Sequence, residues 1–496
     1  MINTKELTVF NGGEISASTL GEGNAGTISL NVTNNTNLIG DNSRLSVATS
    51  GSGKPGNIVL TTGHLNVSQG AEITATATST ATNSQEGGNI TIYTPEMNLN
   101  GRVAIIAETQ GVIPAGTINL QSPKGGQNLN INFSQSAEIS ASTSAQGTGG
   151  SIVLTAPEAI ALLGQGTLKV ESSGLGNAGN INFSTQNLTI AGGVTVLAST
   201  SAQGTGGNID VIAGNSFLLG QSNLLTETTG IGIAGNINIS TSKFTAQNAQ
   251  ISARSQGQGN SGNINFYVMG ELSATDSEIQ TSALQSSGGA INITAGDIRL
   301  WGNSDISTNV FSGVGGGDIT LTADSILAFH DSDILAFARD GKGGNITLNT
   351  PAFFGFNYRP LPDGIDPVTL DGNERVDINA SGAVNGLINL PDLSFIQNSL
   401  TKLPDNLINT ENIIANSCVV RSSKKQGTFN ITGSGGLPTR PGDASVSPFP
   451  TAEVRSIPSN SVSITTPGWK RGDPIVEPTG VYKLPSGELA LHSECF

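Results

Sequence analysis

Short segments in which apolar and polar residues alternate recur along the first 390 residues of the chain. Within residues 88–115, for example, residues 90–93, 97–99 and 103–108 form three such segments, and Gly, Pro and Asn lie between them. Alternation with a period of two residues is the pattern of β-strands. Since no stretch sustains the periodicity of a helix, the sequence predicts an all-β protein with three short strands in each repeat.

The tripeptide Gly-X-Ile marks each repeat. Its isoleucines recur at nearly even intervals, and a further copy follows after a longer interval: Ile28, Ile58, Ile90, Ile118, Ile152, Ile181, Ile209, Ile237, Ile264, Ile291, Ile319, Ile346 and then Ile388. Repeats of about 30 residues that hold three strands indicate a solenoid. We therefore expect residues 1–390 to form a right-handed parallel β-helix of about thirteen three-strand coils.

Stacking is what makes such coils stable. Three short strands cannot bury themselves, but coils spaced about 4.8 Å apart pair in parallel and bury their isoleucines in one column. The Gly that opens every Gly-X-Ile indicates a backbone with positive φ or a close approach between coils. At the X position, Asn180, Asn208, Asn236 and Asn263 are expected to stack their side-chain amides into a ladder.

Segments outside the regular repeat define the remaining boundaries. The long final interval predicts an insertion at residues 351–377 in the last coil. After residue 390 the repeat stops and prolines become frequent, which predicts a C-terminal cap over 391–432 and an extended tail over 433–496 with a terminal hairpin formed by 481–484 and 488–492. Residues 7–17 match second and third strands that lack a first strand, so we expect a chain that begins in the middle of a coil.

Composition changes this view little but excludes several classes of function. Gly occurs 65 times and aromatic residues make up only 4% of the chain, which suits a thin stacked core. The net charge of −15 opposes binding to nucleic acid or anionic lipid. Two cysteines cannot form a disulfide scaffold, no apolar stretch is long enough for a transmembrane segment, and the N-terminal residues do not match a signal peptide.

Several features resemble the C-terminal part of cyanobacterial filamentous haemagglutinin family exoproteins. These are the evenly repeated Gly-Asn-Ile coils, the segments 390–393 and 403–407 that precede Cys418, and the Gly-rich segment 433–438. The resemblance implies two-partner secretion, in which an N-terminal domain, missing from this chain, is recognised by an outer-membrane transporter. It also implies that the parent protein lies outside the cell or on the outer membrane surface.

Candidate catalytic residues are few. The densest acid-base cluster is the segment 330–333, His-Asp-Ser-Asp, and the β-helix fold also includes polysaccharide lyases and hydrolases that use carboxylates in this way. We interpret the segment as a solvated turn. The tripeptide 471–473, Arg-Gly-Asp, matches a cell-attachment motif, but a three-residue match carries little information.

A stack of carboxylates is a more specific signal. Glu278, Asp305 and Asp333 each precede an Ile and are separated from one another by one repeat, so they should stack on three successive coils. We expect an outward, hydrated acidic stripe; the alternative is a structural Ca²⁺ ladder, because bound calcium would relieve the repulsion between carboxylates. No other cofactor is expected.

Two further groups of residues are candidates for contacts. Phe353, Phe354, Phe356 and Tyr358 either cover the end of the coil column or form a loop that contacts a partner. Cys418 and Cys495 could close a disulfide in an oxidising compartment.

These observations favour a non-enzymatic, adhesin-like rod at the cell surface or in the secreted fraction, with a cell-surface protein or polysaccharide as its partner. The alternative is a carbohydrate-active β-helix enzyme.

Overall fold

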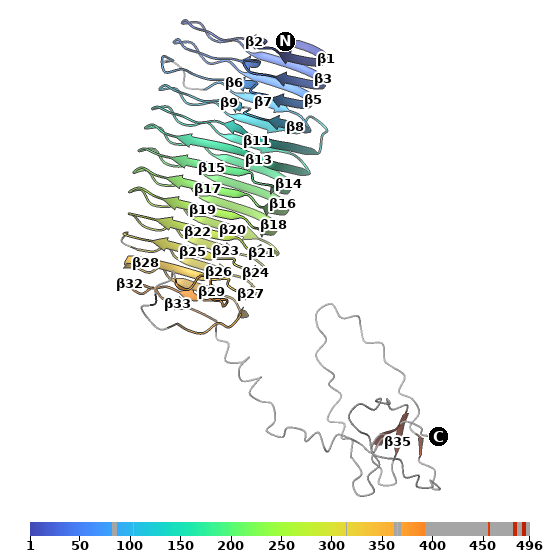
Figure 1. The fold of residues 1–496 in the computed structure, drawn as a ribbon, viewed down its shortest axis with the longest axis vertical. Helices are drawn as coiled ribbons and strands as arrows, with labels where there is room; N and C mark the ends of the chain where they lie inside the picture. Colours follow the sequence, from blue (N-terminus) through green and yellow to red (C-terminus); the bar gives the residue numbers. More distant parts are fainter. Residues whose placement is uncertain are drawn as a thin grey trace. The chain divides into compact units, whose positions relative to one another are not determined.

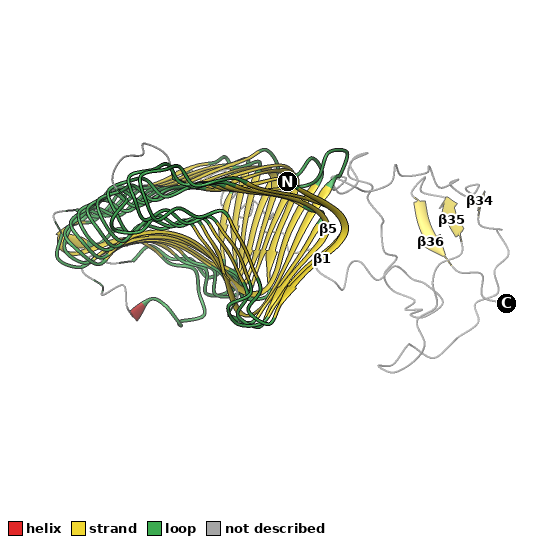
Figure 2. Ribbon diagram, turned by 90° about the horizontal axis from the view of Figure 1, so that it is seen from above, coloured by secondary structure: helices red, strands yellow, loops and turns green. Residues whose placement is uncertain are grey.

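The computed structural model describes residues 1–81, 87–102, 104–313, 315–361, 365, 369–391, 455–456, 480–483 and 489–492. The chain divides into two units, Met1–Leu393 and Ser394–Phe496. In the first unit strands stack coil upon coil (Figure 1), and a view along the stack shows the strands of successive coils superimposed (Figure 2). None of the described residues forms an α-helix.

Each Gly-X-Ile tripeptide opens a first strand of a coil. These strands are β3 (Ile28–Ile39), β5 (Ile58–Ser68), β7 (Ile90–Tyr93), β10 (Ile118–Gln121), β12 (Ile152–Thr155), β14 (Ile181–Ala191), β16 (Ile209–Gly220), β18 (Ile237–Gln247), β20 (Ile264–Val268), β23 (Ile291–Thr294), β26 (Ile319–Thr322), β29 (Ile346–Asn349) and β33 (Ile388–Asn389). Five of them, β3, β5, β14, β16 and β18, are long enough to include the second strand of their coil.

The other strands complete the coils. Separate second strands are β8 (Glu96–Asn100), β21 (Glu271–Thr275), β24 (Asp297–Trp301), β27 (Ser325–Ala328) and β30 (Phe353–Gly355), whereas β11 (Asn128–Ser140) and β13 (Ala159–Ser172) join second and third strands. Third strands are β2 (Glu14–Ser16), β4 (Arg44–Ser46), β6 (Glu72–Thr74), β9 (Ala104–Ile106), β15 (Thr195–Thr200), β17 (Asn223–Thr228), β19 (Gln250–Ser255), β22 (Glu278–Ala283), β25 (Ile306–Val310), β28 (Ile334–Lys342), β31 (Ile378–Asn379) and β32 (Gly382–Val384).

All strand pairs in this unit are parallel, and the isoleucines pair with one another from coil to coil: Ile28 with Ile58, Ile209 with Ile237, Ile346 with Ile388. The thirteen first strands among the described residues bound twelve complete coils, about one fewer than the sequence suggested. The predicted parallel β-helix is confirmed. Twelve steps of about 4.8 Å give a stack roughly 60 Å long.

The isoleucine column forms the centre of a thin core. Its first twelve members are at most 5% exposed, whereas Ile388 is 43% exposed because no described coil covers it. Phe217, Phe244 and Phe266 stack edge to face within the core of successive coils, with ring centroids 5.3 and 5.0 Å apart. Edge-to-face contacts of this kind stabilise a core beyond its buried area.

The repeated glycine is required by close packing between coils. At Gly235 a Cβ atom would lie 1.8 Å from the carbonyl oxygen of Gly207, and at Gly207 it would lie 1.5 Å from that of Gly179. None of these glycines has a positive φ. Of the two explanations that the sequence allowed, the close backbone approach is therefore the one that holds.

Asparagine ladders run along the stack, but the ladder predicted at the X position is formed by bonds from backbone N–H groups to side-chain oxygens and not by bonds between side-chain amides. The side-chain oxygen of Asn208 accepts the backbone N–H of Asn236 at 2.8 Å, and that of Asn236 accepts the backbone N–H of Asn263 at 2.8 Å. Side-chain amides bond to one another elsewhere, as in the run Asp210, Asn238, Asn265, Asn292. At the X position the side-chain oxygen therefore bonds to the backbone of the following coil and not to the neighbouring side-chain amide.

The first strand of the opening coil is partly present, which corrects the sequence-based expectation. Strand β1 (Ile2–Phe10) pairs with β3 from Ile2 opposite Leu30 to Phe10 opposite Ile39, with a register shift after Thr4. Residues 2–4 therefore continue a first strand. This segment is too short, with Ile2 as its one large apolar residue, to show the alternation that identifies the other first strands.

The insertion in the last coil is shorter than predicted at its N-terminal side. Strand β30 occupies the regular second-strand position, with Phe353 opposite Ile326. The third strand resumes at β31, where Ile378 pairs with Ile334. The extra residues therefore lie between Gly355 and Ile378 and do not begin at residue 351.

In the second unit, β35 (Gly480–Lys483) pairs antiparallel with β36 (Leu489–His492) where the sequence predicts a hairpin, and β34 (Arg455–Ser456) pairs parallel with β35. The cap predicted for 391–432 lies, except for residue 391, outside the described residues, as do most of the tail 433–496, the tripeptide 471–473 and both Cys418 and Cys495.

Candidate functional site

The predicted carboxylate stack is present and is longer than expected. Pairing of the adjacent isoleucines places Glu278, Asp305 and Asp333 on successive coils. The same pairing adds Asp377 as a fourth member. The sequence-based reasoning missed Asp377 because the insertion places it far beyond the next expected repeat position after Asp333.

Carboxylates in this stack bond to the backbone of the next coil. Asp305 Oδ1 accepts the N–H of Asp333 at 2.9 Å, and Asp333 Oδ1 accepts the N–H of Asp377 at 2.8 Å. Asp377 also forms an ion pair with Arg375 at 2.7 Å. These are the contacts that asparagine makes at the X position, so the stack is in part a ladder between coils.

The expectation of an outward, hydrated stripe is wrong for the C-terminal half of the stack. The side chains of Asp333 and Asp377 are 0% exposed. Burial raises the pKa of Asp333 to about 8 against the opposing hydrogen bond from Asp377, and the nearby Asp305, Asp377 and Asp331 carboxylates raise it further. Burial likewise raises the pKa of Asp305 to about 7. Asp333 Oδ2 has no hydrogen-bond partner among the described residues.

Calcium coordination would need several oxygen ligands around one point. Within the described part of the chain, no group of three or more His, Cys, Asp or Glu side chains is placed to hold a metal ion. The stack therefore offers single carboxylates to successive backbone amides, and a calcium ladder at Glu278, Asp305 and Asp333 remains a hypothesis that requires these side chains to reorient.

The side chains of the segment 330–333 contact different partners. His330 has a φ of 58° in the turn between two strands and lies between the rings of Trp301 and Phe356, with centroids 6.1 and 6.2 Å away. Asp331 accepts three backbone N–H groups from residues 372–374 at 2.6 to 3.0 Å. Asp331 thus binds residues 372–374 of the insertion to the preceding coil through hydrogen bonds.

The four aromatic residues of the last coil have two different environments. Phe353 is 5% exposed and lies edge to face with Tyr358, which packs partly buried on the core. Phe354 and Phe356 are 50% and 39% exposed. The first pair covers the core, and the second pair is available on the surface.

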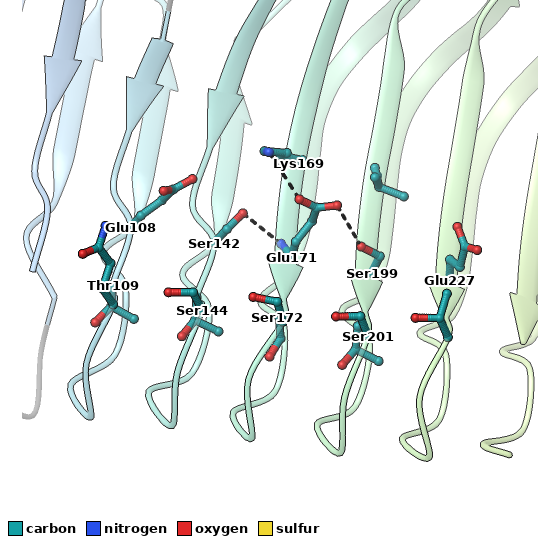
Figure 3. Close-up of a pocket in the computed structure, with 16 residues that line it drawn as sticks. Glu108, Thr109, Ser142, Ser144, Lys169, Glu171, Ser172, Ser199, Ser201 and Glu227 are labelled. Atoms are coloured by element: carbon teal, nitrogen blue, oxygen red, sulfur yellow. Dashed lines mark hydrogen bonds and ion pairs between the residues drawn. The ribbon is translucent and has the colours of Figure 1, made fainter. Parts of the chain in front are cut away.

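The structure also contains a groove that the sequence-based reasoning missed. It follows the outward face of the third strands, measures about 470 Å³, and is lined by residues that include Glu108, Ser142, Lys169, Glu171, Ser199 and Glu227. Figure 3 shows these side chains side by side on successive coils. We call it the third-strand groove.

Register explains how the groove is built. Glu171 pairs with Ser199, Ser199 with Glu227, and Glu227 with Arg254 in successive third strands. The isolated bridges Thr109 to Thr143 and Thr143 to Ser172 involve the next residue in each coil, and they place Glu108 and Ser142 in the same column as Glu171. Carboxylates thus recur on every second coil, about 10 Å apart at the usual strand spacing.

Each carboxylate in the groove is held in place by a neighbour. Lys169 lies 3.3 Å from Glu171 and 3.1 Å from Glu138, and Ser199 donates a hydrogen bond to Glu171 at 3.2 Å. Arg254 donates to Glu227 at 3.0 Å. These ion pairs orient the carboxylates toward fixed positions on the groove wall.

Burial and neighbouring charges shift the pKa values of Glu108 and Lys169 in the groove. Burial raises the pKa of Glu108, although a short hydrogen bond from Ser140 and the charge of Lys169 oppose the rise. Burial alone would lower the pKa of Lys169, but Glu138 and Glu171 outweigh it, so the pKa is raised and the ammonium stays charged. Glu171 therefore faces a stable cation, whereas Glu108 lies in a drier environment.

A signal for this groove exists in the sequence. In each third strand, the residue that lines the groove follows a buried apolar residue at a fixed spacing. Glu171 follows Leu168 and Glu227 follows Leu224 at this spacing. The residue before each isoleucine, where Glu278 lies, belongs to a different column. Glu and Ser alternate at this offset from coil to coil: Glu108, Ser142, Glu171, Ser199 and Glu227.

Within the described residues, no helix has the length and apolarity that a membrane span requires. Comparisons of the chain with family models, with curated proteins and with solved structures find no match to any of them.

Proposed function

We propose that this protein is a non-enzymatic, adhesin-like rod that acts at the cell surface or outside the cell. The observation that carries the proposal is the parallel pairing of successive coils, from β1 against β3 to β29 against β33. A solenoid of this kind presents long, regular surfaces whose repeated side chains suit the binding of extended partners.

The exterior chemistry supports the same conclusion. Outward Asn, Ser and Thr side chains bond along the stack, as Asn66 does to Asn37 and Asn98 does to Asn66. Such ladders stabilise the rod. The resemblance to filamentous haemagglutinin family exoproteins agrees with this proposal, and extends it to export through an outer-membrane transporter and to cell-surface protein or polysaccharide partners.

A second candidate function rests on the third-strand groove. Burial raises the pKa of Glu108, as a general acid requires, and Glu171, which forms an ion pair with Lys169, is a second carboxyl group in the same column. Glu108 and Glu171 lie two coils apart in the same column, and inverting glycoside hydrolases likewise use a pair of separated carboxyl groups. A carbohydrate-active β-helix enzyme is therefore the alternative to the rod.

One experiment separates the two functions. The full chain is incubated with neutral and acidic polysaccharides, and the soluble fraction is assayed for reducing ends and unsaturated uronates. The rod predicts retention of the protein on a polysaccharide or cell surface with no product. Product release that Glu108→Gln abolishes would overturn the rod in favour of the enzyme.

A further inference from the structure

Hydroxyls and carboxylates alternate along the axis of the third-strand groove. Ser142 and Ser199 lie between the carboxylates of Glu108, Glu171 and Glu227, one group per coil. The strands that carry adjacent groups are about 4.8 Å apart, so like groups recur about every 10 Å along the stack. The groove therefore offers donors and acceptors in a repeating order, which an extended polymer with repeating hydroxyl groups can match.

The polar groups of the groove are fixed before any ligand arrives. Lys169 and Ser199 hold Glu171, and Arg254 holds Glu227, at 3.0 to 3.3 Å. Side chains that are already ordered lose little entropy on binding. Each carboxylate still has lone pairs that these contacts leave free, because an ionised carboxylate has about four acceptor sites.

Other ligand classes fit the groove poorly. The net charge of −15 opposes anionic polymers. A peptide that adds as a β-strand needs free backbone groups, but here Thr143 N–H bonds to Glu171 O, and Ser201 N–H to Ser172 O. Leu197 is the one large apolar side chain among the described residues that line the groove, so an apolar ligand would bury little surface.

We propose that the third-strand groove binds an extended, uncharged oligosaccharide along the axis of the rod. In this arrangement Glu171 and Glu227 accept hydrogen bonds from sugar hydroxyls, and Ser142 and Ser199 complete the contacts on the coils beside them. The proposal rests on the proposed function, since it names the partner class of the adhesive rod.

Isothermal titration calorimetry of the full chain tests the groove directly. The probes are the hexasaccharides of β-1,4-linked glucose, xylose, mannose and N-acetylglucosamine, with hexagalacturonate and hexalysine as charged probes. We expect at least one neutral hexasaccharide to bind. Glu171→Gln and Ser199→Ala should each weaken it about tenfold or more, which corresponds to about 1.4 kcal/mol.

The control is Thr294→Val, which removes an exposed hydroxyl from β23 in a first strand, away from the groove. It should bind like the wild type, and the thermal midpoints of all variants should agree within a few degrees. Three results would overturn the proposal: no neutral hexasaccharide binds, binding is equal in the groove variants, or only a charged probe binds.

A parallel measurement of adhesion keeps the two proposals apart. If the wild type adheres to cells and the groove variants adhere equally well, the groove proposal fails and the rod stands. If the wild type adheres to no surface but binds a hexasaccharide at the groove, the adhesive function fails and the binding site stands.

Discussion

The buried carboxylate of Asp333 makes the last coil sensitive to pH, and Asp333→Asn isolates the effect. Asp333 is 0% exposed, its Oδ1 accepts the N–H of Asp377, and its Oδ2 has no partner among the described residues. An asparagine keeps the accepting Oδ1 and cannot ionise. The X position shows that this exchange is tolerated, because Asn236 accepts a backbone N–H in the same way.

The direction of the effect follows from the pKa of the folded state. Burial raises the pKa of Asp333 from 3.8 to about 8, so between these values the folded chain binds a proton that the unfolded chain has released. The contribution of Asp333 to stability is therefore fully present below about pH 4 and is lost as the pH rises toward 8. At about 1.36 kcal/mol per pH unit, the loss could reach on the order of 5 kcal/mol.

The measured loss should be smaller than this limit. Opening of the last coil admits water to Asp333, so the loss cannot exceed the free energy that holds that coil closed. Asp305, whose pKa is about 7, adds a second contribution of the same sign. Glu278, Asp331, Asp371 and Asp377 face the same region, and Arg375 pairs with Asp377.

Hydrogen exchange read by mass spectrometry measures this opening. Peptides that cover residues 369–380 should lose protection between pH 5 and pH 8 in the wild type, after correction for intrinsic exchange. Asp333→Asn should reduce the slope and Asp305→Asn with Asp333→Asn should abolish it. The matched control is Asp318→Asn, since Asp318 is exposed and its Oδ1 accepts the N–H of Asn345 at 2.7 Å.

Equal slopes in the wild type and Asp333→Asn would refute this reasoning. So would protection that rises with pH, because it would mean that the ionised carboxylate stabilises the coil.

Four other outcomes follow from the packing and the ladders. Phe244→Ala should destabilise the stack by about 3–5 kcal/mol in urea unfolding, because it leaves a cavity between Phe217 and Phe266; a loss below about 1 kcal/mol would contradict the packing. Gly235→Ala should disrupt local pairing in circular dichroism and exchange, whereas Gly220→Ala, whose Cβ would lie 3.7 Å from Ala191, should not. Asn236→Ala should cost about 1 kcal/mol by removing the acceptor for Asn263 N–H, and equal urea midpoints would argue against the ladder. If calcium binds the carboxylate stack, millimolar Ca²⁺ should raise the thermal midpoint relative to EDTA, and an unchanged midpoint would end that hypothesis.

Most of the fold could be predicted because its signals are local and repeated. The period of Gly-X-Ile and the alternation within each segment were enough to identify strands, coils and a parallel stack. The close approach at Gly207 and Gly235 could not be chosen over a positive φ, because the sequence does not show how near one coil lies to the next. Likewise, residues 2–4 form too short a segment to show the alternation that would identify them as a strand.

The candidate sites were less accessible to sequence reasoning. Register placed Glu278, Asp305 and Asp333 together, but their burial depends on how the insertion folds back, with residues 372–374 donating to Asp331. The third-strand groove depends on a column that runs across several coils. Such a column becomes visible only when every position of the repeat is aligned.

Adhesion with simultaneous product analysis tests the central proposal most directly. Beads coated with the full chain, with Glu171→Gln or with Thr294→Val are exposed to labelled neutral polysaccharide, and bound label and soluble reducing ends are measured together. An adhesive rod predicts saturable binding without released sugar, and binding at the third-strand groove predicts in addition that Glu171→Gln weakens it and Thr294→Val does not. Release of reducing ends by the wild type, or the absence of any binding, would contradict it.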